Sequence, residues 1–148
     1  MVLDVWVSLL KRIGVKGLNL AYVGRWIGHS LRGHVLHNSI VKAAPIRGEA
    51  ALGWLTHYGV GVGFAAVLYA SQGSSWFHNP AMLPAMVVGA CTVVAPLFVM
   101  QPAMGAGFAA SKTPAPLANC ARSLANHSVF GLGLYASAFA TNWIRALV

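Results

Sequence analysis

The sequence predicts an all-α membrane protein, a four-helix transmembrane bundle with an amphipathic helix in a cytoplasmic loop. Hydrophobic residues make up 57% of its 148 residues and charged residues only 8%, whereas a soluble domain usually carries roughly 25% charged residues. So few charges cannot shield so apolar a chain from water, and lipid is therefore expected to cover much of its surface. The length is that of one domain, so we expect residues 1–148 to form a single integral membrane domain.

Three long apolar stretches predict three of the transmembrane helices. They run from about Ala50 to Ala70, from about Ala81 to Met100 and from about Leu124 to Ile144. Each is close to the ~20 residues that a helix needs to cross the hydrocarbon core. An open strand would leave backbone groups unpaired in lipid, so helix is the expected conformation. Prolines 84 and 96 favour a kink in the second stretch.

A shorter apolar run, Met1 to Leu10, predicts an incomplete first helix. At ~1.5 Å per residue it reaches only about half-way across a bilayer. Either it is a partial helix stabilised by its neighbours, or the chain begins downstream of the natural start.

The connecting loops differ sharply in charge. Nine basic residues lie in the first and third loops, whereas residues 71–80 between them have no charge; the nine are Lys11, Arg12, Lys16, Arg25, Arg32, Lys42, Arg47, Lys112 and Arg122. The positive-inside rule then puts the first and third loops in the cytoplasm and both termini in the periplasm.

The first loop, Lys11 to Glu49, is too long to be a bare turn. Its centre predicts an amphipathic helix in the headgroup layer, with Leu20, Val23, Ile27 and Leu31 on one face and Arg25, His29 and Arg32 on another. Tyr22 and Trp26 would anchor this helix at the interface, although glycines at 24, 28 and 33 weaken it.

The net charge of +8 indicates anionic lipid headgroups as a partner. Nucleic acid is excluded, because that function needs basic residues with exposed aromatic side chains on a soluble fold. Another membrane protein or a second copy of the chain remains a possible partner.

Several strings in the sequence resemble a known bacterial membrane family. They are GRWIGH at 24–29, GWLTHY at 53–58, APLFVMQP at 95–102, GAG at 105–107 with SKTP at 111–114, and HSVFGLGLY at 127–135. Together they are similar to the family catalogued as domain of unknown function 2938, over nearly the whole chain from Asp4 onward. The resemblance implies a four-helix protein of the bacterial inner membrane and supplies no activity. Family members begin with a longer apolar stretch before the position of Asp4, which favours a shortened first helix here.

Ionisable groups inside membrane helices are functional candidates, because burying them in lipid is expensive. Asp4, His57 and His127 each lie five to seven residues from a basic or interfacial landmark at the cytoplasmic side. At ~1.5 Å per residue they would share a depth of about 7–11 Å. Gln101 would close this polar layer from below, and Glu49 would lie at its edge.

Three interpretations of this layer stay open. The polar groups could join helices to one another, each contributing ~0.6 to 2 kcal/mol. They could form a pocket for a proton, an ion or a small ligand. A haem or metal site, with His57 and His127 as facing ligands, is the weakest alternative, and we expect no cofactor. Glu49 could be a carboxylate that favours the helix start or the partner of Arg25 or Arg47 at the headgroup level.

An enzyme is not expected, because two carboxylates and no nucleophile–base motif offer little for acid–base chemistry. The leading hypothesis is a membrane protein that binds or passes a small ligand, ion or proton. The alternative is a structural or accessory subunit of a larger membrane complex. The pairs Gly59–Gly63 and Gly133–Ser137 predict close packing of the second and fourth helices.

Overall fold

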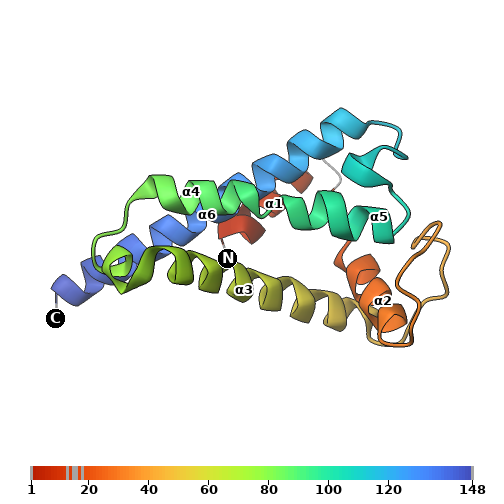
Figure 1. Cartoon of the computed structure of the whole chain (residues 1–148), viewed down its shortest axis with the longest axis horizontal. Helices are drawn as coiled ribbons and strands as arrows, with labels where there is room; N and C mark the ends of the chain where they lie inside the picture. Colours follow the sequence, from red (N-terminus) through yellow and green to blue (C-terminus); the bar gives the residue numbers. More distant parts are fainter. Residues whose placement is uncertain (1, 13, 15–16, 18, 148) are drawn as a thin grey trace. The chain divides into compact units, whose positions relative to one another are not determined.

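The computed structural model describes residues 2–12, 14, 17 and 19–147. Within these residues all regular structure is helical, which confirms the all-α prediction. The elements are α1 (Val2–Arg12), α2 (Leu20–Ser30), α3 (Glu49–His78), α4 (Met82–Cys91), the π-helix η1 (Ala95–Met100), α5 (Gln101–Ala103), the 3₁₀-helix η2 (Phe108–Ala110) and α6 (Pro116–Ala146) (Figure 1).

The chain divides into two compact units, each considered by itself below. The first unit comprises Met1–Gly17, Val62–Val93 and Leu124–Val148, and the second comprises Leu18–Gly61 and Val94–Ser123. The long helices α3 and α6 contribute to both units.

Helix α1 has 11 residues and agrees with the predicted short first helix. At ~1.5 Å per residue it is roughly 16 Å long, about half the hydrocarbon thickness. It lies beside α6 in the first unit, because a methyl group added to Gly133 would meet the Val2 side chain at 3.2 Å.

Helix α2 confirms the helix predicted in the first loop and corrects the role of one residue. It begins where the Asn19 side chain accepts a hydrogen bond from the Ala21 N–H, at 3.0 Å. Arg25 was expected on the polar, headgroup-facing side, but it is buried, with 7% of its surface exposed. Gly24 was expected only to weaken the helix. A methyl group there would overlap the carbonyl oxygen of Glu49, so glycine permits the close approach of α2 to α3.

Helix α3 contains the predicted Ala50–Ala70 span and continues into the predicted outer loop. It is interrupted at Gly73, whose φ of 71° and ψ of −178° are not helical. Such a conformation favours glycine. The last five residues of α3, 74–78, therefore start in a new direction beyond the predicted span.

The second predicted span, Ala81–Met100, corresponds to α4 and η1, and α5 follows it directly. Pro84 lies in the first turn of α4, where a missing N–H is tolerated. Pro96 begins η1, where the backbone changes from α to π geometry. The backbone thus departs from α geometry around Pro96, whereas the predicted kink itself stays a prediction.

Two helices among the described residues, Glu49–His78 and Met82–Ala103, are long and apolar enough to cross a membrane. Helix α6 has 31 residues but is not among them. It begins at Pro116, eight residues before the predicted Leu124, and so includes Arg122, which we had assigned to the third loop.

The first unit is held by a close helix crossing that the sequence did not predict. A methyl group at Gly89 in α4 would lie 2.6 Å from Cα of Gly131 in α6, and Figure 1 shows the two helices side by side. The predicted pair Gly59–Gly63 does not make such a contact, since no atom lies within 4 Å of a methyl group at either position. Nearby, Leu68, Trp76, Ala85 and Ala138 form a buried apolar cluster.

Candidate functional site

In the first unit, His127 is the predicted site residue whose partner is clearest. It lies in α6 opposite the C-terminal end of α4, and its Nδ1 is 2.7 Å from Oγ1 of Thr92. The Thr92 hydroxyl donates to the Gly89 carbonyl at 2.6 Å, so the Nδ1–H of His127 donates to Thr92. In a neutral ring, Nε2 is then the acceptor. The ring centroid of Phe64 lies 6.3 Å from that of His127.

Two further polar contacts connect α6 to its neighbours within the first unit. The Trp6 indole N–H in α1 donates to Oδ1 of Asn126 at 3.0 Å. The Asn142 amide donates to the carbonyl oxygens of Phe77 and His78 at 2.6 and 2.8 Å. Asn126, His127 and Asn142 of α6 thus bond to α1, to the end of α4 and to α3 respectively. The sequence analysis did not single out Thr92, Asn126 or Asn142.

Asp4 lies in α1, half-buried, in the same unit as His127. It lines a shallow hollow of about 300 Å³ with Val5, Ser8, Leu9 and Arg12. At about 100° per residue, Asp4 is on a different face of α1 from Val2 and Trp6, the residues that contact α6. Arg12, which also lines the hollow, lies about two turns further along the same helix.

His57 belongs to the second unit, unlike Asp4 and His127. Its ring lies 5.9 Å from that of Trp54 and 5.5 Å from that of Tyr58 along α3. The prediction of one polar layer containing all three residues therefore stays a prediction. The depth predicted for His127 was counted from Arg122 as if a helix began there. That starting point is wrong, because α6 begins at Pro116.

Glu49 forms an ion pair with Arg25, one of the two partners proposed from the sequence. Nε and Nη2 of Arg25 each donate to one carboxylate oxygen at 2.8 Å. The same carboxylate accepts from the Ile46 N–H at 3.1 Å, just before α3 begins. This bidentate geometry is the strongest form of an arginine–carboxylate contact. Glu49 thereby joins the start of α3 to α2.

Arg25 uses its remaining donors on the loop between α2 and α3. Its Nη1 donates to the Ala43 carbonyl at 3.0 Å and to those of Ile40 and Val41 at 3.3 Å. The Glu49 hydrogen bonds raise the pKa of Arg25 above its ordinary value, against the opposing effect of burial. The guanidinium also lies 5.2 Å from the ring centroid of Tyr22. Arg25 is therefore a structural cation that binds Glu49 and three loop carbonyls.

Gln101 begins α5 in the second unit and is half-buried. Its Oε1 and Nδ1 of His37 are buried without a hydrogen-bond partner in the described part of the chain. His37 makes an edge-to-face ring contact with His29 at 5.2 Å. No three His, Cys, Asp or Glu side chains gather as a metal-binding group among the described residues. Gln101 thus lies in a region with unused hydrogen-bonding capacity.

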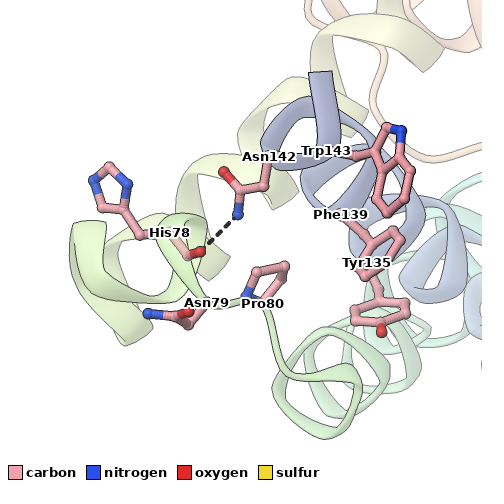
Figure 2. A pocket seen from close by; sticks show the side chains of 7 residues that line it. All are labelled: His78, Asn79, Pro80, Tyr135, Phe139, Asn142 and Trp143. Carbon is pink, nitrogen blue, oxygen red and sulfur yellow. Dashed lines mark hydrogen bonds between the residues drawn. The ribbon is translucent and has the colours of Figure 1, made fainter. Parts of the chain in front are cut away.

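A second hollow lies at the other end of the first unit and contains none of the predicted site residues. It measures about 420 Å³ and is lined by His78, Asn79, Pro80, Tyr135, Phe139, Asn142 and Trp143. Figure 2 shows the three aromatic rings along α6 on one side, with Pro80 and the Asn142–His78 hydrogen bond on the other. The aromatic residues recur every four positions, which places them on one helix face.

Comparison with known proteins identifies the family of the chain. No curated protein and no solved structure matches it. A family described as "Protein of unknown function (DUF2938)" matches residues 1–141. The match confirms the resemblance found in the sequence and covers most of the chain, and the chain therefore belongs to the DUF2938 family.

Proposed function

We propose that this chain is a multi-pass protein of the bacterial inner membrane in which α3 and the α4–η1–α5 segment are transmembrane helices. Their length and apolar composition support this assignment. The hydrogen bonds between the first loop and the end of α5, such as that from the His37 N–H to the Ala103 carbonyl, support a common side for the first and third loops. The basic residues of both loops favour the cytoplasmic side, with both termini periplasmic.

Helix α6 is a further membrane helix in this proposal, and its internal contacts explain its lower hydropathy. Its polar side chains Asn126, His127 and Asn142 hydrogen-bond to other helices of the first unit. Polar groups satisfied inside the protein do not have to face lipid. With the short helix α1, this makes four membrane segments.

The topology can be tested by cysteine labelling of intact cells. After replacement of Cys91 and Cys120 by serine, Ser74→Cys should react with a membrane-impermeant maleimide added outside. Lys112→Cys should react only after the membrane is opened. Labelling of Lys112→Cys from outside intact cells would overturn the proposed orientation.

For the activity, we propose that the protein binds or passes a proton or small ion at a site that includes His127. The observation that carries this proposal is the hydrogen bond between His127 and Thr92. It fixes the orientation of a titratable ring between two apolar helices. Histidine is suited to proton exchange, because its ordinary pKa lies near neutrality.

Proton flux into proteoliposomes that contain a pH-sensitive dye tests this activity. The wild-type protein should acidify the lumen faster than protein-free liposomes do, and His127→Gln should remove the excess flux. Thr92→Val should change the rate while leaving His127 in place. A wild-type rate equal to that of empty liposomes would exclude proton passage.

The alternative function, an accessory subunit of a larger complex, also has a specific observation in its favour. Gly59 and Gly63 lie one turn apart on α3 and are exposed, and no atom of the described residues lies within 4 Å of a methyl group placed at either position. A neighbouring membrane helix could approach closely there. Native mass spectrometry in mild detergent separates the two functions, because an accessory subunit should be released together with a stoichiometric partner.

A further inference from the structure

The loop of residues 31–48, which we call the strap, is attached to one end of each candidate span. Helix α3 begins at Glu49, directly after it. On its other side, the His37 N–H donates to the Ala103 carbonyl at 2.8 Å and the Ile40 N–H to the Met104 carbonyl at 3.0 Å. Ala103 is the last residue of the other span. If the two spans cross a bilayer, the strap lies at the membrane surface where α3 begins and α5 ends.

The strap is held in shape by side chains of α2 rather than by a regular element of its own. The Trp26 indole N–H donates to the Val35 carbonyl at 2.9 Å, and His29 Nε2–H donates to the Ala44 carbonyl at 2.9 Å. Arg25 donates to three further strap carbonyls. These bonds satisfy backbone groups on the inner side of the strap. The outer side can therefore present its side chains in a defined arrangement.

The outer side combines aliphatic and basic side chains. Leu31 and Leu36 are each 80% exposed, Val41 59% and Val35 48%. Arg32, Lys42 and Arg47 are exposed among them. The strap contains no acidic residue, and the nearest one in sequence, Glu49, is already paired with Arg25. The strap surface is thus both apolar and positively charged, and no acidic residue of the strap neutralises that charge.

We propose that the strap docks onto the anionic phospholipids of the leaflet at which α3 begins and α5 ends. Leu31 and Leu36 would enter the boundary between headgroups and acyl chains, and the three basic side chains would meet lipid phosphates. Anionic lipid is chosen over a protein partner because the chain itself brings the strap to a bilayer surface and its charge is opposite to that surface. The inference rests on the proposed membrane insertion. It assigns lipid contact to the strap, whereas the sequence assigned it to α2.

An environment-sensitive fluorophore at position 36 tests the proposal in the intact protein. Leu36→Cys, with Cys91 and Cys120 replaced by serine, is labelled with NBD and reconstituted in vesicles of phosphatidylglycerol or of phosphatidylcholine. In phosphatidylglycerol the emission should shift to the blue and be quenched by doxyl-labelled lipid. Replacement of Arg32, Lys42 or Arg47 by glutamine should lower the docked-to-undocked ratio roughly fivefold for each basic residue removed. NBD at Ser74→Cys is the control, and its emission should not depend on these three residues.

Two results would overturn the proposal. One is water-like emission at position 36 in phosphatidylglycerol vesicles. The other is a blue shift of equal size in phosphatidylcholine that survives the glutamine substitutions, because anionic lipid would then not be recognised. Carbonate extraction of the same vesicles separates this failure from failure of the proposed function. If the protein resists extraction while position 36 stays in water, only the docking of the strap is refuted. If the protein is extracted, the proposed membrane insertion is refuted.

Discussion

Glycines let helices approach closely in both units, but a guanidinium and a carboxylate join α2 to the start of α3 in the second unit, whereas indole, amide, hydroxyl and imidazole groups make the hydrogen bonds between α1, α4 and α6 in the first. The Arg25–Glu49 pair lies beside the strap, among loop residues that carry most of the basic charge. The Gly89–Gly131 crossing and the Thr92–His127 bond lie within long apolar helices. A charge at the centre of a bilayer costs ~2.5 to 3.5 kcal/mol on insertion scales, so neutral contacts suit helices in lipid and charged ones suit the interface. The kind of contact therefore agrees with the environments proposed for the loop between α2 and α3 and for the helices α4 and α6.

The largest effect is expected from a methyl group at the helix crossing of the first unit. In Gly131→Ala the new Cβ would lie 2.6 Å from the Ala85 carbonyl oxygen and 3.2 Å from Cα of Gly89. Backbone atoms cannot move aside as a flexible side chain can, so the variant should lose its folded, monodisperse form in detergent. Gly63→Ala is the matched control in a helix interior, with no atom within 4 Å. Its melting temperature should stay equal or rise, because alanine favours helix. Equal stability of the two variants would contradict the α4–α6 crossing.

Loss of the ion pair in the second unit should have the next largest effect. Arg25→Gln leaves the Glu49 carboxylate without its main partner and three strap carbonyls without their donor. Removal of one member of such a buried pair is strongly destabilising, and Tm should fall by more than about 5 °C. Arg32→Gln, at an exposed position of the same loop, should leave Tm nearly unchanged.

A double-mutant cycle sharpens this result. Arg25→Gln combined with Glu49→Gln should be less destabilising than the sum of the two single changes, because each single change leaves one charge unpaired. Additive effects would show that the two residues are not coupled. The second unit would then not depend on a charged contact, and the contrast with the first unit would fail.

A smaller effect is expected for the neutral hydrogen bond between α4 and α6. Thr92→Val keeps the shape of the side chain but removes the group that accepts from His127. Measured bonds of this kind between membrane helices average ~0.6 kcal/mol, with a maximum near ~1.7 kcal/mol, so unfolding in mixed micelles should show a loss of this size. A loss as large as that of Arg25→Gln would remove the distinction between the two units.

The smallest effect is expected at the contact between α1 and α6. Trp6→Phe keeps an aromatic ring but loses the indole N–H that donates to Asn126. We expect a loss of about 0.6 kcal/mol or less in the same unfolding measurement. Asn126→Leu should give a similar value, since it removes the acceptor of the same bond. A much larger loss in either variant would mean that α1 is more important to the first unit than its 11 residues suggest.

Helix positions were predictable to the extent that a local pattern marked them. The amphipathic spacing of Leu20, Val23 and Ile27 identified α2, and the apolar run after Glu49 identified α3. The start of α6 was missed, because Arg122 looked like a loop residue and polar residues precede Leu124. Helical periodicity also put Arg25 on the headgroup-facing side, because it could not show that a loop folds over that face.

For the candidate site, the sequence indicated which residues have functional side chains but not which of them lie together. His127 and Glu49 were singled out as polar groups in apolar surroundings, and both have defined hydrogen-bond partners. Thr92 was not singled out, because a threonine is common in apolar helices and only its position opposite His127 makes it important. The Gly-xxx-Gly spacing at Gly59 suggested a helix contact, whereas the contact is made by Gly89 and Gly131, which lie far apart in the chain.

The sequence by itself determined the helical class, the two spans apolar enough for a membrane and the family. Hydropathy, helix signals and motif strings are properties of neighbouring residues, so they can be recognised without a structure. The tertiary structure decided that Arg25 pairs with Glu49, 24 residues away, and that Thr92 meets His127, 35 residues away. Partners so distant in sequence are chosen by which helices lie together, and this in turn depends on where glycine lets two backbones approach.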